Sequence, residues 1–205
     1  MRLVLGSRNK KKLKEMVALL ADLPIEITDL TPYPDAPEVA ETADTFIGNA
    51  ILKAATLAPL LGTWVIGEDS GLCVPALGGA PGVYSARYAG AHGDDEANND
   101  KLLRTLASYS GADRAAYYVS TAALANPRGE VVARVEGRCH GLIAEARRGE
   151  GGFGYDPLFV VPEHGKTFGE LPPEVKAQMS HRAKALADLR PLIERELLGR
   201  ELARE

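Results

Sequence analysis

Two adjacent carboxylates, Glu68 and Asp69, follow a short apolar run at residues 64–66. The run predicts a buried strand, and Ser70 and Gly71 predict a turn after it. A carboxylate is costly to bury without a partner, and ligands of open α/β sheets bind at the carboxyl ends of strands. We therefore predict that this segment is the floor of an active site that holds a divalent cation. A solvated connection between strand and turn is the alternative, because Asp, Ser and Gly are common in turns.

A second candidate site is the turn after the predicted first strand, residues 3–5. Hydrophobic spacing predicts a helix from about Lys10 to Leu20, so Ser7, Asn9 and three consecutive lysines lie at its start. Unpaired backbone N–H groups at a helix start favour an anion, whereas lysines there oppose the helix dipole. A bound phosphate would remove this conflict. The alternative is a solvated lysine face.

Other side chains with suitable chemistry are spread along the chain. Carboxylates together with lysines predict metal-assisted phosphoryl chemistry, because oxygen ligands hold Mg²⁺ while ammonium groups neutralise phosphate oxygens. A glycosidase also uses paired carboxylates, although no aromatic residues surround this pair. A lone lysine in an apolar helix is usually a surface residue, which is the alternative for Lys53. The distributed set is Lys12, Glu41, Lys53, Glu68, Asp69, Phe153, Asp156, Lys176, Ser180, His181 and Arg182.

The elements that must position these residues follow from hydrophobic periodicity and turn signals. Leu13, Met16, Val17 and Leu20 form the expected core face of the first helix. Asp44 is the expected N-cap of the second helix, and Ser180 that of the last. Further strands are expected at 25–28, 72–74, 115–125, 131–140 and 158–161. Further helices are expected at 45–61, from Asp94 or Asp95 to about 108, and after 180. The last helix is expected to have Leu186, Leu189, Ile193 and Leu197 on its core face. The strands at 115–125 and 131–140 predict an antiparallel hairpin.

Composition limits the possible partners. The chain has 205 residues, 45% hydrophobic and 25% charged, with a net charge of −4. An acidic chain is a poor candidate for binding nucleic acid, and no apolar window predicts a membrane span. Cys73 and Cys139 lack the spacing of a zinc or redox site and predict buried thiols, which fits a cytoplasmic protein. No linker is visible, so we expect a single domain over residues 1–205.

Several segments resemble, in order, the inosine triphosphate pyrophosphatase family, also called Ham1 or dITP/XTP pyrophosphatases. The opening Ser-Arg-Asn-Lys-Lys-Lys matches that family's [ST]-x-N-x-x-K pattern. Two departures stand out, since Gly48 replaces a common Glu and Glu68 replaces a common Asp. The similar segments are residues 7–12, 45–54, 69–72, 78–88, 151–157 and 180–182.

The resemblance implies an α/β fold with a long mixed β-sheet flanked by helices, two lobes with a central cleft, and a homodimer. It implies hydrolysis of ITP, dITP or XTP to the monophosphate and pyrophosphate, with Mg²⁺ or Mn²⁺ as cofactor. Asp69 would be metal ligand and general base, Glu41 the second ligand, and Glu68 an assisting carboxylate. Two rivals are a nucleotide sensor without turnover and a related pyrophosphatase that acts on modified pyrimidine nucleotides.

The same resemblance implies which residues bind the substrate. Phe153 would stack on the base, and Arg182, backed by His181, would donate to O6, where adenine carries a donor instead. The alternative is that these two residues are solvated in the first turn of the last helix. The full expected set is Ser7, Arg8, Asn9, Lys10, Lys11, Lys12, Lys53, Ser70, Phe153, Gly154, Tyr155, Asp156, Lys176, His181 and Arg182.

Overall fold

The computed structural model describes residues 1–199 of the chain. These residues belong to two compact units, each assembled from separate segments. Unit 1 comprises Met1–Asp69, Ser120–Gly137 and the segment from Arg182 onward, and unit 2 comprises Ser70–Val119 and Arg138–His181.

The strands form a seven-stranded sheet in the order β2-β1-β3-β4-β5-β6-β7. β1 pairs in parallel with β2 and β3, whereas β6 pairs antiparallel with β5 and β7. The expected mixed sheet of an α/β fold is therefore confirmed. The strands are β1 (Arg2–Leu5), β2 (Glu26–Thr28), β3 (Trp64–Cys73), β4 (Ala115–Ala125), β5 (Val131–Ile143), β6 (Phe159–Val161) and β7 (Lys166–Thr167).

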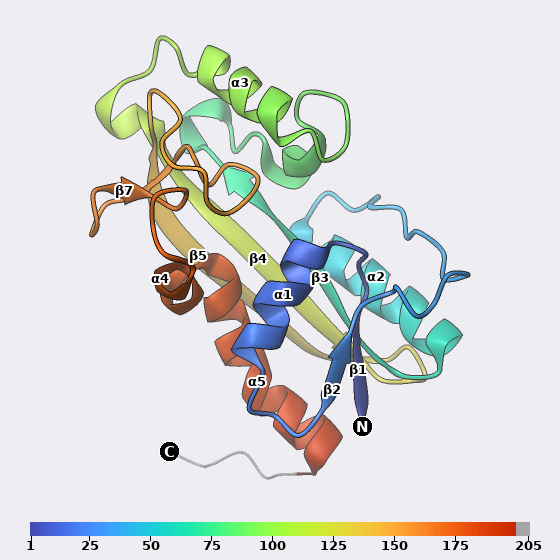
Figure 1. The fold of residues 1–205 in the computed structure, drawn as a ribbon. Helices are drawn as coiled ribbons and strands as arrows, with labels where there is room; N and C mark the ends of the chain where they lie inside the picture. Colours follow the sequence, from blue (N-terminus) through green and yellow to red (C-terminus); the bar gives the residue numbers. More distant parts are fainter. Residues whose placement is uncertain (200–205) are drawn as a thin grey trace. The chain divides into compact units, whose positions relative to one another are not determined.

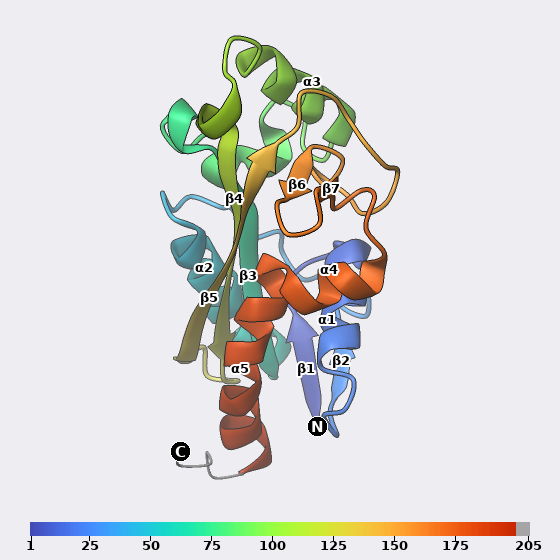
Figure 2. The ribbon, with the colours of Figure 1, turned by 90° about the vertical axis from the view of Figure 1, so that its left-hand side faces the viewer.

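In unit 1, helices cover both faces of the strands (Figure 1, Figure 2). Successive side chains of a strand point to opposite faces, so Leu3 and Leu5 share one apolar cluster while Val4 joins another. The first cluster contains core residues of α1 (Lys10–Leu19) and α5 (His181–Leu198), and the second contains those of α2 (Phe46–Leu61). α2 thus packs on one face of the strands, and α1 and α5 pack on the other.

In unit 2, a single apolar cluster packs around three aromatic rings. The Tyr118 ring lies 4.7 Å from that of Phe159 and 6.2 Å from that of Phe168, centroid to centroid. Leu102 and Leu106, in and just after α3 (Asp95–Thr105), are buried in the same cluster. The unit also contains α4 (Pro173–Met179) and the 3₁₀ turns at Pro75–Leu77, Gly82–Arg87 and Gly111–Arg114.

The main departure from expectation is the length of β3. The sequence predicts a short strand, a turn at Ser70 and Gly71, and a second strand, but β3 runs without interruption for ten residues. Pairing with β1 ends at Ile66, but β3 also pairs with β4 and is buried along most of its length, which explains why it continues. Glu68 and Asp69 therefore lie inside a strand.

Smaller departures concern helix boundaries. Thr45, not Asp44, caps α2, because its Oγ1 accepts a hydrogen bond from Gly48 N at 3.2 Å. Val17 of α1 is 40% exposed and does not belong to the core face. Neither α4 nor β7 is predicted from the sequence. Ser180 lies between α4 and α5, directly before the first residue of α5.

Other expectations are confirmed. The predicted core residues of the last helix, Leu186, Leu189, Ile193 and Leu197, are all buried. β4 and β5 are neighbours in the sheet, and Asn126 N donates to Glu130 O at 3.0 Å in the turn that joins them. Within residues 1–199, no helix is both long and apolar enough to cross a membrane.

Candidate functional site

Strand β3 sends its two adjacent carboxylates to opposite faces. Ile66 belongs to the apolar cluster of α1 and α5, and Glu68, two residues later, contacts Lys12 of α1 and Arg182 of α5. Asp69 points the other way and contacts Asn49 and Lys53 of α2. This alternation follows from the period of two of a β-strand. Glu68 and Asp69 therefore serve two separate clusters, although they are neighbours in the sequence.

The Asp69 cluster comprises two carboxylates and one buried lysine. Lys53 Nζ lies 2.6 Å from Glu41 Oε1 and 3.6 Å from Asp69 Oδ1. It also donates to the backbone oxygen of Glu68 at 3.1 Å. Lys53 is only 8% exposed, so it is not the surface lysine that its apolar helix suggested. Its positive charge offsets the cost of placing the Asp69 carboxylate in a buried position.

Asp69 has an environment suited to accepting a proton. Burial raises the pKa of its carboxyl, the charge of Lys53 opposes this, and the charge of Glu41 raises the pKa further. Burial lowers the pKa of Lys53, but the nearby carboxylates outweigh burial and leave it raised. A carboxylate whose pKa lies above its usual value is a stronger base than an ordinary Asp. Asp69 is therefore the best-placed general base in this cluster.

Asn49 links Asp69 to the loop that carries Glu41. Its Nδ2 donates to Asp69 Oδ2 at 3.1 Å, and its Oδ1 accepts from Ala43 N at 2.9 Å. The side chain is fully buried. Asn49 thus fixes the orientation of the carboxylate and fastens the loop two residues beyond Glu41. Asn49 is not predicted from the sequence, because an asparagine inside a helix gives no signal of the long-range contacts that it makes.

The Glu41 and Asp69 carboxylates also suit a hard divalent cation. Within residues 1–199, no group of three or more His, Cys, Asp or Glu side chains forms a metal site by itself. Mg²⁺ is commonly bound through one or two carboxylates, with waters and substrate phosphates as its other ligands. The charge of Glu41 already raises the pKa of Asp69, so a cation here would relieve the repulsion between the two carboxylates.

The Glu68 cluster is a buried network of charges. Glu68 Oε2 lies 2.5 Å from Lys12 Nζ, and Oε1 lies 2.9 Å from Arg182 Nη2. Ser120 Oγ donates to Glu68 Oε1 at 2.9 Å, and Arg182 also pairs with Glu15. Burial raises the pKa of Glu68, but Lys12 and Arg182 more than offset it, so the pKa lies well below its usual value. Glu68 is therefore an ionised carboxylate that holds two cations.

The Arg182 side chain, which was expected to donate to the base, contacts carboxylates instead. Its Nε and Nη2 donate to Glu68, and its Nη1 pairs with Glu15. The side chain is 1% exposed, so it is not solvated in the first turn of α5 either. The guanidinium is engaged by carboxylates of its own unit, and this geometry does not favour the interpretation that Arg182 donates to a base.

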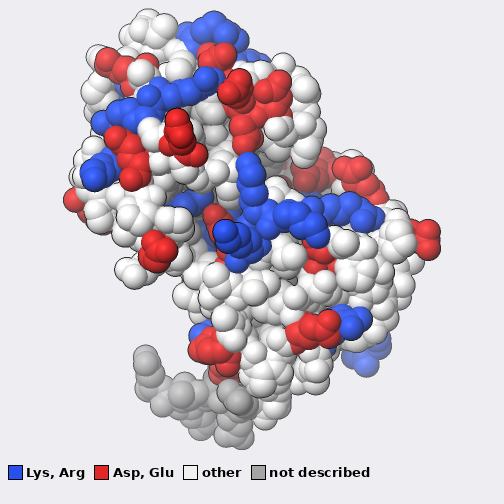
Figure 3. Space-filling model, viewed as in Figure 1, with Lys and Arg blue, Asp and Glu red and all other residues white. Residues whose placement is uncertain are grey.

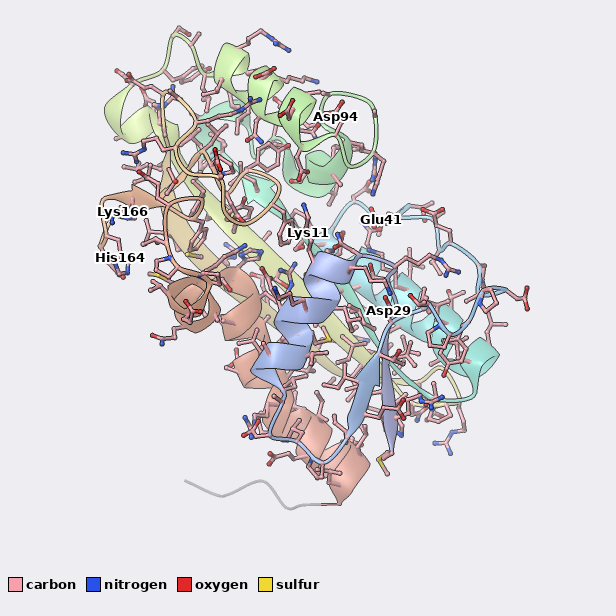
Figure 4. The ribbon with its side chains drawn as sticks, viewed as in Figure 1. Lys11, Asp29, Glu41, Asp94, His164 and Lys166 are labelled. Atoms are coloured by element: carbon pink, nitrogen blue, oxygen red, sulfur yellow. The ribbon has the colours of Figure 1, made fainter. Side chains whose placement is uncertain are left out.

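The turn before α1 places Ser7, Asn9 and three lysines at a helix start, as the sequence predicts. Asn9 Oδ1 caps α1 by accepting from Lys11 N at 3.0 Å and Lys12 N at 3.2 Å, and Ser7 Oγ accepts from Asn9 N at 3.1 Å. Figure 3 shows Lys and Arg side chains gathered over the start of α1. Figure 4 shows Lys11 in the first turn of this helix. Cations are thus concentrated at this end of α1, as the sequence predicts.

Two residues of this turn are engaged elsewhere. Arg8 donates to four backbone oxygens of the loop that follows β2, including those of Leu30 and Ala36 at 3.1 Å each. Lys10 pairs with buried Asp29 at 2.7 Å, at the end of β2 (Figure 4). Both side chains therefore fasten the loop between β2 and α2. Direct binding of substrate by Arg8 and Lys10 stays a prediction that these contacts do not favour.

Unit 2 brings together most of the residues that were expected to bind a base. Asp156 is 1% exposed, and its Oδ2 accepts from Phe153 N at 2.8 Å and from Lys176 Nζ at 2.7 Å. Lys176 Nζ also lies 4.7 Å from the centre of the Phe153 ring. Asp156 thus fixes an ammonium group beside the face of a half-buried aromatic ring.

Tyr118 extends this cluster and was not predicted. Its ring stacks on His181 with centroids 4.6 Å apart, and its hydroxyl donates to Asp156 Oδ1 at 3.3 Å. Burial and the charge of Asp156 raise the pKa of Tyr118 well above its usual value, so the hydroxyl keeps its proton.

Tyr155, which was expected to bind the substrate, is also buried, and its hydroxyl donates to Ser85 O at 2.8 Å, which indicates a structural role. Ser70 lies half-buried in β3.

The sequence profile of the Ham1 family matches residues 3–192. The chain belongs to the Ham1 family. The dITP/XTP pyrophosphatase of Geobacillus kaustophilus is 52% identical over 187 residues, which are 91% of each chain. That of Rhodopirellula baltica is 52% identical over 184 residues, covering 90% of this chain and 88% of the relative.

Solved structures of Ham1 family members have the same fold. A HAM1 protein from Coxiella burnetii is 40% identical, with a TM-score of 0.86 over 94% of this chain and 98% of the other. The dITP/XTP pyrophosphatase of Mycobacterium abscessus is 44% identical, with a TM-score of 0.76 over 93% and 100%. The family assignment made from short motifs is therefore confirmed.

Proposed function

We propose that this Ham1 family protein hydrolyses purine nucleoside triphosphates with a non-standard base, namely ITP, dITP and XTP, to the monophosphate and pyrophosphate. The observation that carries the proposal is the Asp69 cluster, in which a carboxylate with a raised pKa lies beside a buried lysine. Relatives that are about half identical over most of the chain carry the name dITP/XTP pyrophosphatase. The role of such an enzyme is to remove these nucleotides from the cellular pool.

In the proposed reaction Asp69 accepts a proton from a water molecule, whose oxygen bonds to the α-phosphorus. The bond between that phosphorus and the oxygen bridging to the β-phosphorus breaks, and pyrophosphate leaves with the bonding electrons. Lys12 and Lys53 neutralise charge on the phosphate oxygens, and an ammonium group serves this purpose well in a partly dry site. Glu68 holds Lys12 and Arg182 in place and takes no proton.

The proposal includes a divalent cation, since metal dependence is a general property of this family. Glu41 and Asp69 are the residues that would hold it. When bound, it would neutralise phosphate charge and polarise the phosphoryl group. Carboxylate ligands suit Mg²⁺ or Mn²⁺ equally well. The homodimer and the cytoplasmic location that the family resemblance implies stay predictions.

The base is proposed to bind the unit 2 cluster. Stacking on Phe153 supplies affinity for any base, at ~1–3 kcal/mol per base. Lys176, held by Asp156, is the donor that we assign to O6 of hypoxanthine or xanthine. Adenine presents an amino donor at this position, so a lysine there would face donor to donor. Sites that leave a buried polar group unpaired in this way discriminate strongly.

A substrate panel tests the proposal. Initial rates for ITP, dITP, XTP, ATP and GTP are measured with Mg²⁺ and again after chelation by EDTA. We expect kcat/KM for ITP, dITP and XTP to exceed that for ATP at least about 10²-fold, and EDTA to abolish turnover. GTP shares the O6 acceptor, so its rate relative to ITP measures discrimination at the 2-amino group. Binding of ITP without turnover would identify a sensor, and preference for modified pyrimidine nucleotides would identify the other rival. Either outcome would contradict the proposed function.

A further inference from the structure

Helix α3 contacts the segment that follows Phe153 through two side chains. Asp95 Oδ2 accepts from Gly154 N at 2.9 Å, and Asn99 Nδ2 donates to Gly154 O at 2.8 Å. Asp95 is the first residue of α3 and Asn99 lies four residues later, so both side chains project from the same face of the helix. Both backbone polar atoms of Gly154 are thus held by one helix.

The segment is fixed on its other side by Asp156. Phe153 N donates to Asp156 Oδ2, and a Cβ at Gly152 would lie only 2.0 Å from that same oxygen. Gly154 itself has a φ of 62°, a conformation that residues other than glycine rarely adopt. The backbone on either side of the Phe153 ring therefore has little freedom, although Phe153 lies in a glycine-rich loop.

The hydrogen bonds of Asn99 indicate that its amide serves this contact specifically. Its Nδ2 donates to Asp95 O at 2.7 Å as well as to Gly154 O, so both amide hydrogens go to carbonyl oxygens. Its Oδ1 is buried and has no hydrogen-bond partner in the part of the chain that the structure describes. An unsatisfied buried acceptor is costly, so a side chain that only filled space would be better apolar.

We propose that Asp95 and Asn99 are positioning residues for base recognition. By holding Gly154, they set the position of the Phe153 ring and thereby the affinity for the base. This inference rests on the proposed function, because it assigns the Phe153 segment to the base. The inference assigns both residues to the base and neither to the phosphates, so their effect should be confined to ligands that contain a base.

Asn99→Ala tests the inference, with Asn98→Ala as the matched control. Asn98 is a buried asparagine of the same helix, and it bonds Ala86 O and Ala89 N instead of Gly154. Three quantities are measured: KM and kcat for ITP, the inhibition constant of IMP, and that of inorganic tripolyphosphate. In Asn99→Ala we expect KM and the IMP constant to rise about three- to tenfold, the effect of losing one hydrogen bond. We expect kcat and the tripolyphosphate constant to stay within twofold, and Asn98→Ala to show no such selectivity.

Asp95 provides an independent test. Asp95→Ala should weaken the binding of IMP, as Asn99→Ala does. Asp95→Asn keeps an oxygen acceptor for Gly154 N, so it should retain most of the affinity for IMP. This pair decides the question if Asn99→Ala does not fold. The inference would be overturned if the variants weakened the binding of IMP and of tripolyphosphate equally, or if they left the binding of IMP unchanged.

Phe153→Ala separates this inference from the proposed function. If Phe153→Ala weakens IMP binding but the α3 variants do not, the positioning role is wrong and the base site stands. If Phe153→Ala also leaves IMP binding unchanged, the base site itself is wrong, and the inference falls with it.

Discussion

At the scale of single residues, the two adjacent acids of β3 have opposite electrostatic environments. Asp69 has a raised pKa because it is buried near another carboxylate, whereas the pKa of Glu68 is lowered by Lys12 and Arg182, which outweigh its burial. Titratable groups whose environments separate their pKa values in this way mark different chemical roles. Asp69 is suited to accept a proton, and Glu68 is suited to hold cations.

Lys12 offers a test of the phosphate assignment. In Lys12→Ala, the affinity for ITP should fall about tenfold or more, because a charge-assisted hydrogen bond to phosphate is lost. The affinity for IMP should fall much less, since that ligand has one phosphate. Both are measured by calorimetry, with Lys14→Ala as a control, because Lys14 is an exposed lysine of the same helix. An equal loss for ITP and IMP would show that Lys12 does not hold the triphosphate.

The lowered pKa of Glu68 gives a stability prediction with a definite sign. The ionised carboxylate stabilises the fold above about pH 4.3, the usual pKa of an unfolded Glu, and this contribution is lost as pH falls through the lower folded pKa. Glu68→Gln should therefore lower the free energy of unfolding at pH 7 by about 3–5 kcal/mol, since it breaks a buried ion pair. The difference from wild type should narrow below pH 4.

Urea unfolding at pH 7 and at pH 3.5 provides the measurement. Glu130→Gln is the control, because Glu130 pairs with Arg128 on an exposed turn and should change stability little at either pH. If Glu68→Gln lowered the free energy of unfolding equally at both pH values, the assignment of Glu68 as an ionised carboxylate would be contradicted.

At the scale of elements, the sequence predicts most helices and strands but not the continuity of β3. Ser70 and Gly71 are turn residues by local preference, yet they lie inside β3, beyond Ile66, where the pairing with β1 ends. The remaining neighbour, β4, keeps them in the strand. α4 was missed because seven residues after a proline give too short a periodic pattern. Tertiary pairing and packing decide both cases, and neither is visible in a local window.

The packing of β3 against α2 depends on Gly67. A Cβ added there would lie 1.9 Å from Ala50 O and 2.7 Å from Ala54 N, both backbone atoms that cannot move alone. Gly67→Ala should therefore lower the free energy of unfolding by about 1–3 kcal/mol or more, as overpacking does. It should also reduce kcat, because α2 carries Asn49 and Lys53.

Gly6→Ala is the control for this prediction. The atom nearest to its added Cβ would be the end of the Leu57 side chain at 3.0 Å, which can shift, and Ile66 O and Val65 Cγ1 would lie at 3.4 Å, in ordinary contact. A smaller loss is therefore expected. Denaturant unfolding measures both variants. A Gly67→Ala protein as stable as Gly6→Ala would contradict the close packing of β3 on α2.

At the scale of the whole molecule, the sequence predicts the candidate reacting groups better than the residues that position them. Asp69, Glu41, Lys53 and Lys12 were found because carboxylates and lysines are chemically distinctive. Asn49, Ser120 and Tyr118 were missed because their contacts join residues far apart in the chain. The Arg182–Glu68 pair, separated by 114 positions, shows why the role of Arg182 could not be deduced from its neighbours in sequence.

The distribution of charge over the molecule fits a small phosphorylated ligand better than a nucleic acid. The net charge of −4 disfavours a polyanion such as nucleic acid, yet lysines concentrate at the start of α1 and beside Asp69. A small phosphorylated ligand needs only such a local concentration of cations. The molecule thus combines an acidic overall composition with a cationic cluster suited to a triphosphate.

The most direct test of the central claim is a product measurement on ITP with wild-type protein and Asp69→Asn. Chromatography and ³¹P NMR identify the products, and thermal unfolding checks that the variant is folded. Wild type should release IMP and pyrophosphate in equal amounts, and Asp69→Asn should lower kcat at least about 10²-fold, because an amide cannot accept the proton. Formation of IDP and phosphate, or near-wild-type turnover by a folded Asp69→Asn protein, would contradict the account.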